Sequence, residues 1–585
     1  MKQITSILFF LCLSIISFSQ SRVQIAIDDL IAYEPMRYGS LSVCVLDVET
    51  GKILEQYNPM MSLVPASTMK AITTATALGI LGHSYTYKTT LEYDGKIKNG
   101  TLDGNLYIKG SGDPTLGSDQ LEGTPSLEEV MKKMSNSVQK KGIQKVNGYV
   151  VGDGSTFGTA MPAANWQWND IGNYYGVGAG GLNIHENMYY LFLKQKNTLG
   201  STPSIARIVP KMPYLVLMNE IKSDKRGTGD NAYIFGAPYS TTRYLRGTIP
   251  VGNKEFRVKG AMPDPAHYAA HRLTEQLETN GVSTQKIAKN IFEYRREGLD
   301  RYTTRQALIT LTSPPLSKIV QRTNEKSVNL YAEALLKTMA KVKKSVGTTD
   351  KGVETVKEFW EERGMNMEGF FMEDGSGLSP RNGVTSFQLS QIMRKVAKDK
   401  NIFEHFYPSL AVGGRTGTAR YMFKKSKAAG NIRLKSGSMR RVRAYTGYAT
   451  TKSGKLVAFA IIANNFMGKS RLIRTKMEKI MVKDLGWRTT PPTYAMWANW
   501  YMNQWDIYIS TNEYAMSHEV IQRTPDLTFK TSNETAYARF REVMQIVDLI
   551  VLDYSHLQYK PRGLVASIIF MILGIQTGEF DVQRI

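Results

Sequence analysis

The chain has few cysteines, few histidines and no apolar run long enough for a membrane span. Of 585 residues only two are cysteines, Cys12 and Cys44, so a disulfide framework is excluded and stability must come from packed cores. The seven histidines disfavour a hydrolase built on a Ser-His-Asp triad. The longest apolar runs, residues 4–18 and 563–575, hold about 15 and about 13 residues, short of the ~20 that a transmembrane helix needs.

Acidic residues are scarce relative to basic ones. There are 51 Asp and Glu against 74 Lys and Arg, a formal charge of +23, which suits nucleic acid, anionic lipid or an anionic wall polymer. Lys2, the apolar run after it and the small residues that follow predict a secretory signal peptide over residues 1–20. An uncleaved membrane anchor is the alternative. Export argues against nucleic acid as a partner and favours the cell wall or a membrane surface.

The composition divides the rest of the chain into three parts. Residues 21–92 and 295–487 mix helical and strand patterns and predict one discontinuous α/β domain. Residues 93–294 are rich in glycine and turns, with short strand-like runs, and predict a β-rich insertion. Residues 488–585 predict a helical tail of unknown function, whose aromatic stripe is either core, a docking face or a membrane-surface helix.

Periodicity and turn residues also predict single elements within these parts. Strand hairpins are expected over 41–59 and 444–466, and helices over 126–142, 263–281, 316–341, 352–364 and 470–487.

Ser67 and Lys70 stand in "VPASTMKAITTA", at an expected helix start. Pro65 fits such a start, and a spacing of three puts both side chains on one face. The first-turn amides and the helix dipole favour negative charge, and a lysine with a lowered pKa could take the serine proton. Alone, the pair is better explained by a helix cap and a solvated lysine.

Two later stretches supply further candidates. In "KSVNLYAEALL", Ser327 offers a hydroxyl for proton relay and Asn329 a carboxamide for a substrate amide. In "LKSGSM", Lys435 offers a cation, Ser436 a hydroxyl, and Gly437 a close backbone approach. The amide of Ser438, with that of Ser67, could form an oxyanion hole. Taken alone, the first stretch is explained by a capped helix start and a turn asparagine, and the second by a turn before an edge strand.

Together the three motifs read S-x-x-K, S-x-N and K-S-G in that order. Ser327 follows Ser67 by 260 residues, and Lys435 follows Ser327 by 108. This set resembles that of the serine penicillin-recognising enzymes. The chain is most similar to the low-molecular-mass penicillin-binding proteins with a large insertion between the first two motifs, which are D-alanyl-D-alanine carboxypeptidases and endopeptidases. The resemblance covers about residues 22–487 and includes "EDGSGLSPRNGVT", "VGGRTGTAR" and "VVGDGSTFG".

The resemblance implies a fold, a reaction and a location. It implies an α/β (α+β) domain like that of serine β-lactamases and DD-peptidases, active in the periplasm on peptidoglycan peptides, with β-lactams as covalent inhibitors. No cofactor is implied, and contact with the membrane surface remains an expectation. The reaction is cleavage of D-Ala-D-Ala, and as an endopeptidase also of the cross-link between D-alanine and a diamino acid.

The resemblance also assigns roles to residues. Ser67 becomes the acylated nucleophile, Lys70 its base, and Ser327 with Lys435 the proton relay to the leaving amine. Asn329 would hold the substrate peptide. Lys435, Ser436 and Ser438 would hold the terminal carboxylate and line the oxyanion hole around Gly437. Asp153 could pair with a free amino group of the wall peptide, but a turn aspartate explains it equally well.

Departures and alternatives remain. Val328 replaces the usual Asp or Asn of the middle motif, and the third motif has serine in place of threonine. A β-lactamase or esterase of the same fold, or a non-catalytic wall-binding protein, are the alternative functions. His267 and His271 have a spacing known for zinc ligands, but no glutamate follows the first and no third ligand is evident, so no metal site is expected.

Overall fold

The computed structural model describes residues 21–300, 304–424, 426, 428–451 and 453–483. The expected signal peptide at 1–20 and the expected helical tail at 488–585 lie outside the described residues. Within the described ranges, no helix combines the length and the apolar character that crossing a bilayer requires.

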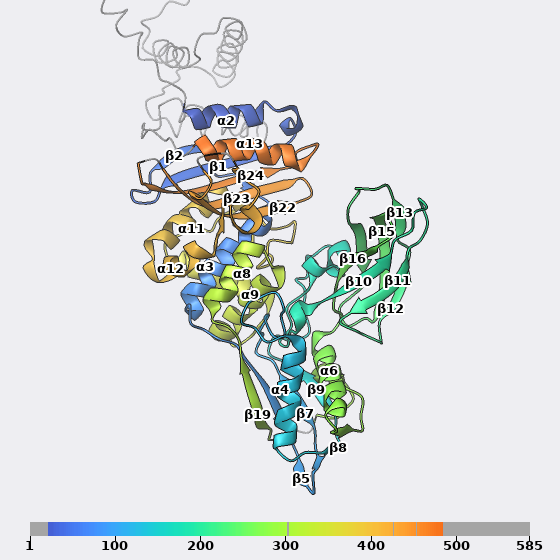
Figure 1. Cartoon of the computed structure of the whole chain (residues 1–585). Coiled ribbons are helices and arrows are strands. Elements are labelled where there is room, and N and C mark those ends of the chain that lie inside the picture. The colour runs from blue at the N-terminus through green and yellow to red at the C-terminus, as the bar shows by residue number, and fades with distance from the viewer. Residues whose placement is uncertain (1–20, 301–303, 425, 427, 452, 484–585) are drawn as a thin grey trace, which may run out of the picture. The chain divides into compact units, whose positions relative to one another are not determined.

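A six-stranded antiparallel sheet forms the centre of the discontinuous domain (Figure 1). Its order is β2 (Ile53–Tyr57), β1 (Ser40–Asp47), β24 (Leu456–Asn464), β23 (Val442–Thr450), β22 (Ile432–Met439) and β21 (Ala411–Val412). Both expected hairpins, β1–β2 and β23–β24, are confirmed. The side chains of β24 alternate between two hydrophobic cores, with Ala460 and Ile462 in one and Phe459 and Ile461 in the other. Burial on both faces explains why its sequence is apolar throughout.

Helices cover both faces of this sheet. On one side α2 (Arg22–Ile31) packs beside α13 (Ser470–Lys483). On the other lie α3 (Met69–Leu81), α8 (Leu316–Lys326), α9 (Asn329–Lys344), α10 (Thr349–Glu361), α11 (Ser386–Lys398) and α12 (Lys400–Ser409) (Figure 1). The short strands β3 (Ser62–Leu63) and β20 (Val384–Thr385) pair with each other. The helices expected over 316–341 and 352–364 are therefore present, and the first is broken in two at Ser327. The helix expected over 470–487 is present over its described residues, 470–483.

The first part of the insertion is a five-stranded sheet with two helices. The strands are β18 (Lys289–Asn290), β9 (Val150–Asp153), β7 (Leu106–Lys109), β4 (Lys88–Tyr93) and β19 (Gln306–Thr312), and α4 (Leu127–Lys140) and α6 (Pro265–Thr279) pack against them. A smaller sheet joins β17 (Ser283–Thr284), β8 (Lys145–Val146), β6 (Thr101–Asp103) and β5 (Lys96–Lys98), and α7 (Ile291–Arg296) follows β18. Both expected helices are confirmed.

The boundaries of the insertion differ from those expected. Strands β4 and β19 pair antiparallel, with Lys88 opposite Thr312, so the insertion's sheet runs from residue 88 to residue 312 rather than from 93 to 294. A pairing between strands more than 200 residues apart leaves no local pattern in the sequence. It also brings the two ends of the insertion together, which keeps the entropic cost of a long insertion small.

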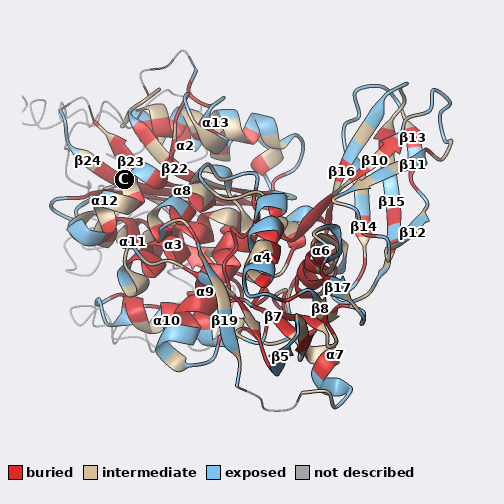
Figure 2. Ribbon diagram, turned by 60° about the horizontal axis from the view of Figure 1, so that its bottom comes forward, coloured by how far each residue is buried: buried red, intermediate tan, exposed pale blue. Residues whose placement is uncertain are grey.

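The second part of the insertion consists of two small sheets. One contains β11 (Ser204–Val209), β10 (Met188–Lys194) and β16 (Glu255–Ala261), and the other β12 (Val216–Asn219), β15 (Thr242–Pro250), β13 (Lys222–Asp224) and β14 (Asn231–Phe235). In β10, Tyr189 and Leu191 are buried while Tyr190 and Phe192 are half-buried, so one face of that strand is packed and the other is less covered. Figure 2 shows the strands of this part as a mixture of buried, intermediate and exposed residues. The helix α5 (Trp168–Ile171) and the 3-10 turn η3 (Tyr174–Gly176) precede this part.

Candidate active site

Ser67 and Lys70 lie where the sequence predicts, at the start of a helix. Ser67 is in a 3-10 turn, η2 (Ala66–Thr68), that leads directly into α3. Its side chain is partly exposed, whereas Lys70 is fully buried, with Nζ 2.9 Å from the Ser67 Oγ. Lys70 Nζ also donates to the carbonyl oxygen of Ser376 at 2.6 Å. The alternative of a solvated surface lysine is therefore wrong.

Burial changes the chemistry of Lys70. Loss of water lowers the pKa of its ammonium group to about 7, although the carboxylates of Asp374 and Glu333 act in the opposite direction. An amine that is about half unprotonated near neutral pH can accept a proton from a serine hydroxyl at hydrogen-bond distance. The site can therefore generate a serine nucleophile without a histidine.

A second serine–lysine pair comes from the two other motifs. Ser327 occupies the break between α8 and α9 in the left-handed region, with φ 61°. Lys435 on β22 is fully buried, and its Nζ donates to the Ser327 Oγ and to the Ser436 carbonyl oxygen, both at 2.8 Å. Burial, and next the charge of Lys70, hold the pKa of Lys435 well below its usual range. The repulsion between the two lysines means that both pairs belong to one site.

The strand β22 approaches Ser67 through Gly437. A Cβ atom at Gly437 would lie 2.5 Å from the Pro65 carbonyl oxygen and 3.1 Å from the Ser67 amide nitrogen. Glycine is thus required by the close approach of two backbones, as the sequence predicts. On its other side β22 pairs with β21 only at Arg433 and Leu434. The backbone from residue 435 onward is therefore an open edge, on which a peptide substrate could lie.

Ser436 and Ser438 continue along this edge. The Ser436 hydroxyl donates to the Thr418 Oγ1 at 2.8 Å, and Ser438 has an exposed side chain. Sequence reasoning missed Thr418, although the stretch that contains it, "VGGRTGTAR", belongs to the resemblance. The role of the Ser438 amide in an oxyanion hole stays a prediction.

Asn329 begins a row of polar side chains on α9. Its Nδ2 donates to the carbonyl oxygen of Tyr175, a residue of the insertion, at 2.7 Å. Glu333 and Lys337 follow at intervals of four residues, so all three share one side of the helix. We call Asn329, Glu333 and Lys337 the polar face of α9. Sequence reasoning missed the last two, although their spacing was visible in "NLYAEALLK".

The two missed residues each hold backbone from a distant part of the chain. Glu333 is buried and accepts hydrogen bonds from the Ser376 amide at 2.7 Å and the Gly375 amide at 3.2 Å. It thereby fixes the backbone directly before the Ser376 carbonyl group, whose oxygen binds Lys70. Lys337 is buried as well and donates to three carbonyl oxygens of the insertion, those of Ala160, Met161 and Ala179, at 2.6 to 2.9 Å. The polar face thus connects α9 and the loop that contains Ser376 to the insertion.

Trp166 makes a further connection from the insertion. Its Nε1 donates to Asp374 Oδ2 at 2.7 Å. The same carboxylate accepts hydrogen bonds from the Gly377 and Ser379 amides and so orders the loop that contains Ser376. The position of the Lys70 ammonium therefore depends on a side chain of the insertion as well as on α9.

Asp153 is engaged within the fold. Its carboxylate lies at the end of β9, almost fully buried, with Oδ2 2.7 Å from the Arg305 Nη1 and Oδ1 accepting from the Ser155 hydroxyl and amide. Burial raises its pKa, but the hydrogen bonds from Ser155 and Arg305 outweigh this effect and the pKa lies below its usual value. These contacts are those of a turn aspartate, and the pairing with a substrate amine stays a prediction.

The two histidines considered for metal binding flank the ring of Tyr214. His267 Nδ1 lies 3.8 Å from a Glu293 oxygen and His271 Nε2 lies 3.4 Å from a Glu275 oxygen. Among residues 21–483, as far as the structure describes them, no three His, Cys, Asp or Glu side chains are grouped to hold a metal ion.

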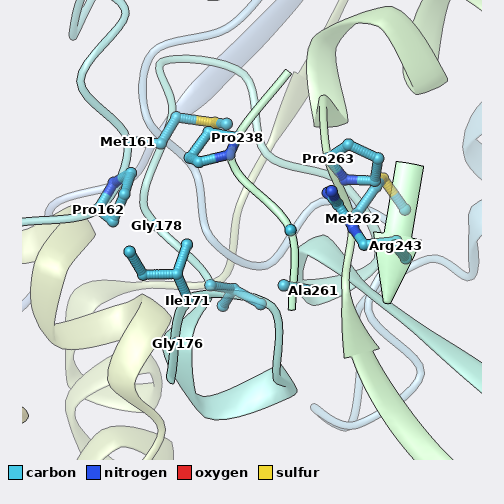
Figure 3. A pocket seen from close by; sticks show the side chains of 12 residues that line it. Met161, Pro162, Ile171, Gly176, Gly178, Pro238, Arg243, Ala261, Met262 and Pro263 are labelled. Atoms are coloured by element: carbon cyan, nitrogen blue, oxygen red, sulfur yellow. The ribbon is translucent and has the colours of Figure 1, made fainter. Parts of the chain in front are cut away.

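A cavity of the insertion lies next to the candidate active site but is not part of it (Figure 3). Its wall is mainly apolar and includes Met161, Ile171 and Gly176, with the buried Arg243 at one side. Arg243 Nη1 donates to backbone carbonyl oxygens of the insertion. The lining contains no residue of the three motifs. We therefore assign this cavity to packing within the insertion.

Comparisons with known proteins agree with this geometry. D-alanyl-D-alanine carboxypeptidase DacB of Haemophilus influenzae is 25% identical over 425 residues, which are 72% of this chain and 84% of that one. D-alanyl-D-alanine carboxypeptidase of an Actinomadura species is 27% identical over 455 residues, 76% and 81% of the two chains. The crystal structure of penicillin binding protein 4 from H. influenzae superposes with a TM-score of 0.68 at 23% identity, covering 79% of this chain and 99% of that one, and confirms the expected fold.

The family match covers both sides of the insertion and the insertion itself. The profile of the D-Ala-D-Ala carboxypeptidase 3 (S13) family matches residues 23–483, nearly the whole of the described structure and all three motifs. With two buried lysines beside two serines at one glycine-lined strand edge, the chain belongs to the D-Ala-D-Ala carboxypeptidase 3 (S13) family.

Proposed function

We propose that this chain cleaves the D-Ala-D-Ala bond of wall peptides through an acyl-enzyme on Ser67. One observation carries the assignment: Lys70 Nζ, with a pKa of about 7, lies 2.9 Å from the Ser67 Oγ at the edge of β22. Family membership supports the reaction type. The assignment of roles to residues is our proposal.

Acylation follows from the two serine–lysine pairs. The neutral Lys70 amine takes the Ser67 hydroxyl proton while Oγ bonds to the carbonyl carbon of the penultimate D-alanine. The amides of Ser67 and Ser438 hold the resulting oxyanion. The Ser327 hydroxyl, bonded to Lys435, then relays the proton held by Lys70 to the leaving amine as the C–N bond breaks, so that Lys70 is neutral again. Free D-alanine leaves, and an ester remains on Ser67.

Deacylation uses water and returns the enzyme to its starting state. A water molecule adds to the ester carbonyl and gives a proton to the neutral Lys70 amine, and Lys70 returns that proton to the Ser67 Oγ as the C–Oγ bond breaks. The shortened peptide is released as a carboxylate. When the leaving amine belongs to the side chain of a diamino acid in a cross-link, the same steps constitute endopeptidase activity.

Substrate binding uses the open edge of β22 and the start of α9. Lys435 and the hydroxyl pair of Ser436 and Thr418 would receive the terminal carboxylate. The hydrogen bond to Tyr175 fixes the carboxamide of Asn329, whose oxygen would accept a substrate amide proton. A β-lactam would enter in the same way, and a crystal structure of the H. influenzae relative was determined in complex with a novel β-lactam.

Mass spectrometry after exposure to penicillin tests the proposal. The intact protein should gain the mass of one penicillin, located on the peptide that contains Ser67, and Ser67→Ala should gain none. Ser62→Ala, a serine five positions earlier that bonds the Gly369 carbonyl oxygen, is the matched control and should be labelled. Labelling of Ser67→Ala would overturn the nucleophile assignment. Turnover of penicillin faster than release of D-alanine from a D-Ala-D-Ala peptide would favour a β-lactamase.

We also propose that the protein acts outside the cytoplasm, in the periplasm. Residues 1–20 have the pattern of a secretory signal, and the substrate of this family is located in the wall. Expression of the full chain followed by cell fractionation and N-terminal sequencing should find a product that begins after Ser19 or Gln20. Retention of residue 1 in a membrane fraction would instead indicate an anchor.

A further inference from the structure

One face of the β11–β10–β16 sheet alternates aromatic and basic side chains. It consists of Tyr190 and Phe192 of β10, Arg207 of β11, and Arg257 and Lys259 of β16, and we call it the aromatic–basic face. Antiparallel register places Lys259 opposite Tyr190, and both arginines opposite Phe192. These side chains are half-buried or exposed, while the intervening residues of β10 are buried. Successive side chains of a strand point to opposite faces of the sheet, so these five residues share the face that is not packed against the core.

Contacts between the rings and the cations hold the cations in place. The guanidinium carbon of Arg207 lies 3.6 Å from the centroid of Phe192, and that of Arg257 lies 4.9 Å from the centroid of Tyr190. Lys259 Nζ is 6.0 Å from the same tyrosine. A mobile arginine or lysine side chain loses rotamer entropy when it binds a ligand. Contact with an aromatic ring orients the cation beforehand and so reduces the entropy lost on binding.

The charge of this face is predominantly positive. Lys194, opposite Glu255 at the end of β10, adds a fourth cation. Glu255 pairs with Arg207 at 2.8 Å. The other carboxylate near Lys259, that of Glu186, is buried and accepts hydrogen bonds from Ser118 and Tyr331. A second exposed carboxylate, that of Asp119, acts on Tyr190. The four cations still outnumber these two exposed carboxylates, so the face attracts anions.

The aromatic–basic face is continuous with the active site. Lys259 Nζ lies 5.0 Å from the ring centroid of Tyr174, whose neighbour Tyr175 accepts the hydrogen bond from Asn329. The backbone is joined too, because Asn173 forms a bridge with Gly260, the residue after Lys259. A chain that leaves the active site past Asn329 thus meets Lys259 first and then the rest of β16.

We propose that the aromatic–basic face binds the part of the wall polymer that extends beyond the scissile bond, through the free carboxylates of its peptide stems. The inference rests on the proposed function, since the occupant is the remainder of that substrate. Continuity with Asn329 favours this polymer over other polyanions, because a nucleic acid or a lipid surface would have no reason to be bound beside a peptidase site. The oriented guanidinium group of Arg257 suits a carboxylate, which it can bind through two parallel hydrogen bonds. Arg207, whose Nη2 is paired with Glu255, adds positive charge beside it.

Co-sedimentation with purified, insoluble peptidoglycan tests the binding without requiring catalysis. In a Ser67→Ala background, the double variant Arg207→Gln/Arg257→Gln should bind about tenfold more weakly at about 10 mM salt, and the difference should largely disappear near about 1 M salt. Lys132→Gln/Lys140→Gln removes two exposed charges from α4 and is the matched control, expected to bind as the parent does. Thermal midpoints of all variants verify that they are folded.

Rates with Ser67 restored complete the test. The arginine double variant should release D-alanine from peptidoglycan about tenfold more slowly, with kcat/KM on a short soluble D-Ala-D-Ala peptide within about twofold of the parent. Equal sedimentation of the two double variants would overturn the inference, and so would an equal loss on the soluble peptide. A loss of binding to DNA or anionic vesicles with peptidoglycan binding unchanged would also overturn it. Failure of the proposed function can be distinguished from failure of this inference. It would appear as the absence of a penicillin adduct on Ser67, while the difference in sedimentation between the two double variants would remain.

Discussion

Lowering the pH below 7 should slow acylation of Ser67, because protonation of Lys70 removes the base. The pKa of this buried ammonium is lowered from 10.5 to about 7, so the free amine prevails above pH 7 and the ammonium below it. The acylation rate by penicillin should therefore fall about tenfold per pH unit below 7 and level off above it.

The magnitude follows from the same pKa. A lysine of pKa 10.5 would present about one free amine in three thousand at pH 7, whereas Lys70 presents about one in two. Burial thus supplies on the order of 10³ more base, equivalent to ~4 kcal/mol. The same effect opposes folding: between pH 7 and 10.5 the unfolded chain binds a proton that the folded chain does not, so the free energy of unfolding rises with pH over that range.

Stopped-flow measurement of acylation by a chromogenic or fluorescent penicillin, from about pH 5 to about pH 9, gives the profile directly. Lys70→Arg keeps the positive charge but cannot release a proton, so it should lose on the order of 10³ in rate and show no rise near pH 7. Lys435→Arg keeps a cation beside Ser327 and should retain the rise that belongs to Lys70.

Two results would refute the reasoning. A rate in the parent protein that stays flat from pH 5 to pH 8 would show that the base does not titrate there. A rise centred above pH 9 would show that Lys70 is protonated in the free enzyme, in spite of its burial, and that another group takes the Ser67 proton.

Three further substitutions have expected outcomes. Gly437→Ala places a Cβ 2.5 Å from the Pro65 carbonyl oxygen, so backbone must move; the change should reduce acylation at least about 100-fold and lower the thermal midpoint, and an unchanged rate would contradict the close approach. Glu333→Gln removes a carboxylate that raises the pKa of Lys70, so the rise in the acylation profile should move to lower pH, and a move to higher pH would contradict this assignment. The same change leaves one of two buried amides without its acceptor and should cost ~1–3 kcal/mol of stability by denaturant unfolding. Asp153→Asn breaks the ion pair with Arg305; because the carboxyl pKa is lowered in the fold, the stability loss should be full at pH 7 and disappear as the pH falls below 3.8, and a loss that persists at lower pH would show that the ion pair is not its cause.

The motif residues could be predicted from the sequence because their chemistry depends on local spacing. Ser67 and Lys70 are one helical turn apart, and Lys435 and Gly437 are two residues apart on one strand. Each spacing places the two residues on the same face of their helix or strand, independently of the rest of the fold. The order of the three motifs then indicated that they meet, since no single motif was decisive.

The supporting residues could not be predicted, because their roles arise from contacts across long sequence separations. Glu333 holds a peptide more than 40 residues later in the chain, and Trp166 reaches Asp374 across 208 residues. The burial of Lys70 has the same origin, since helices from several parts of the chain cover it. The boundaries of the insertion were missed for this reason as well, because the pairing of β4 with β19 has no local signal.

Lys337 has a consequence for attempts to simplify this protein. The adjacency of β4 and β19 suggests that residues 88–312 could be cut out and the ends rejoined with a short linker. Excision would remove Ala160, Met161 and Ala179, whose carbonyl oxygens surround the Lys337 ammonium. A buried ammonium left without acceptors costs several kcal/mol. A minimal version of the enzyme would therefore need Lys337→Met together with the deletion, and evolutionary loss of the insertion would need the same two changes at once.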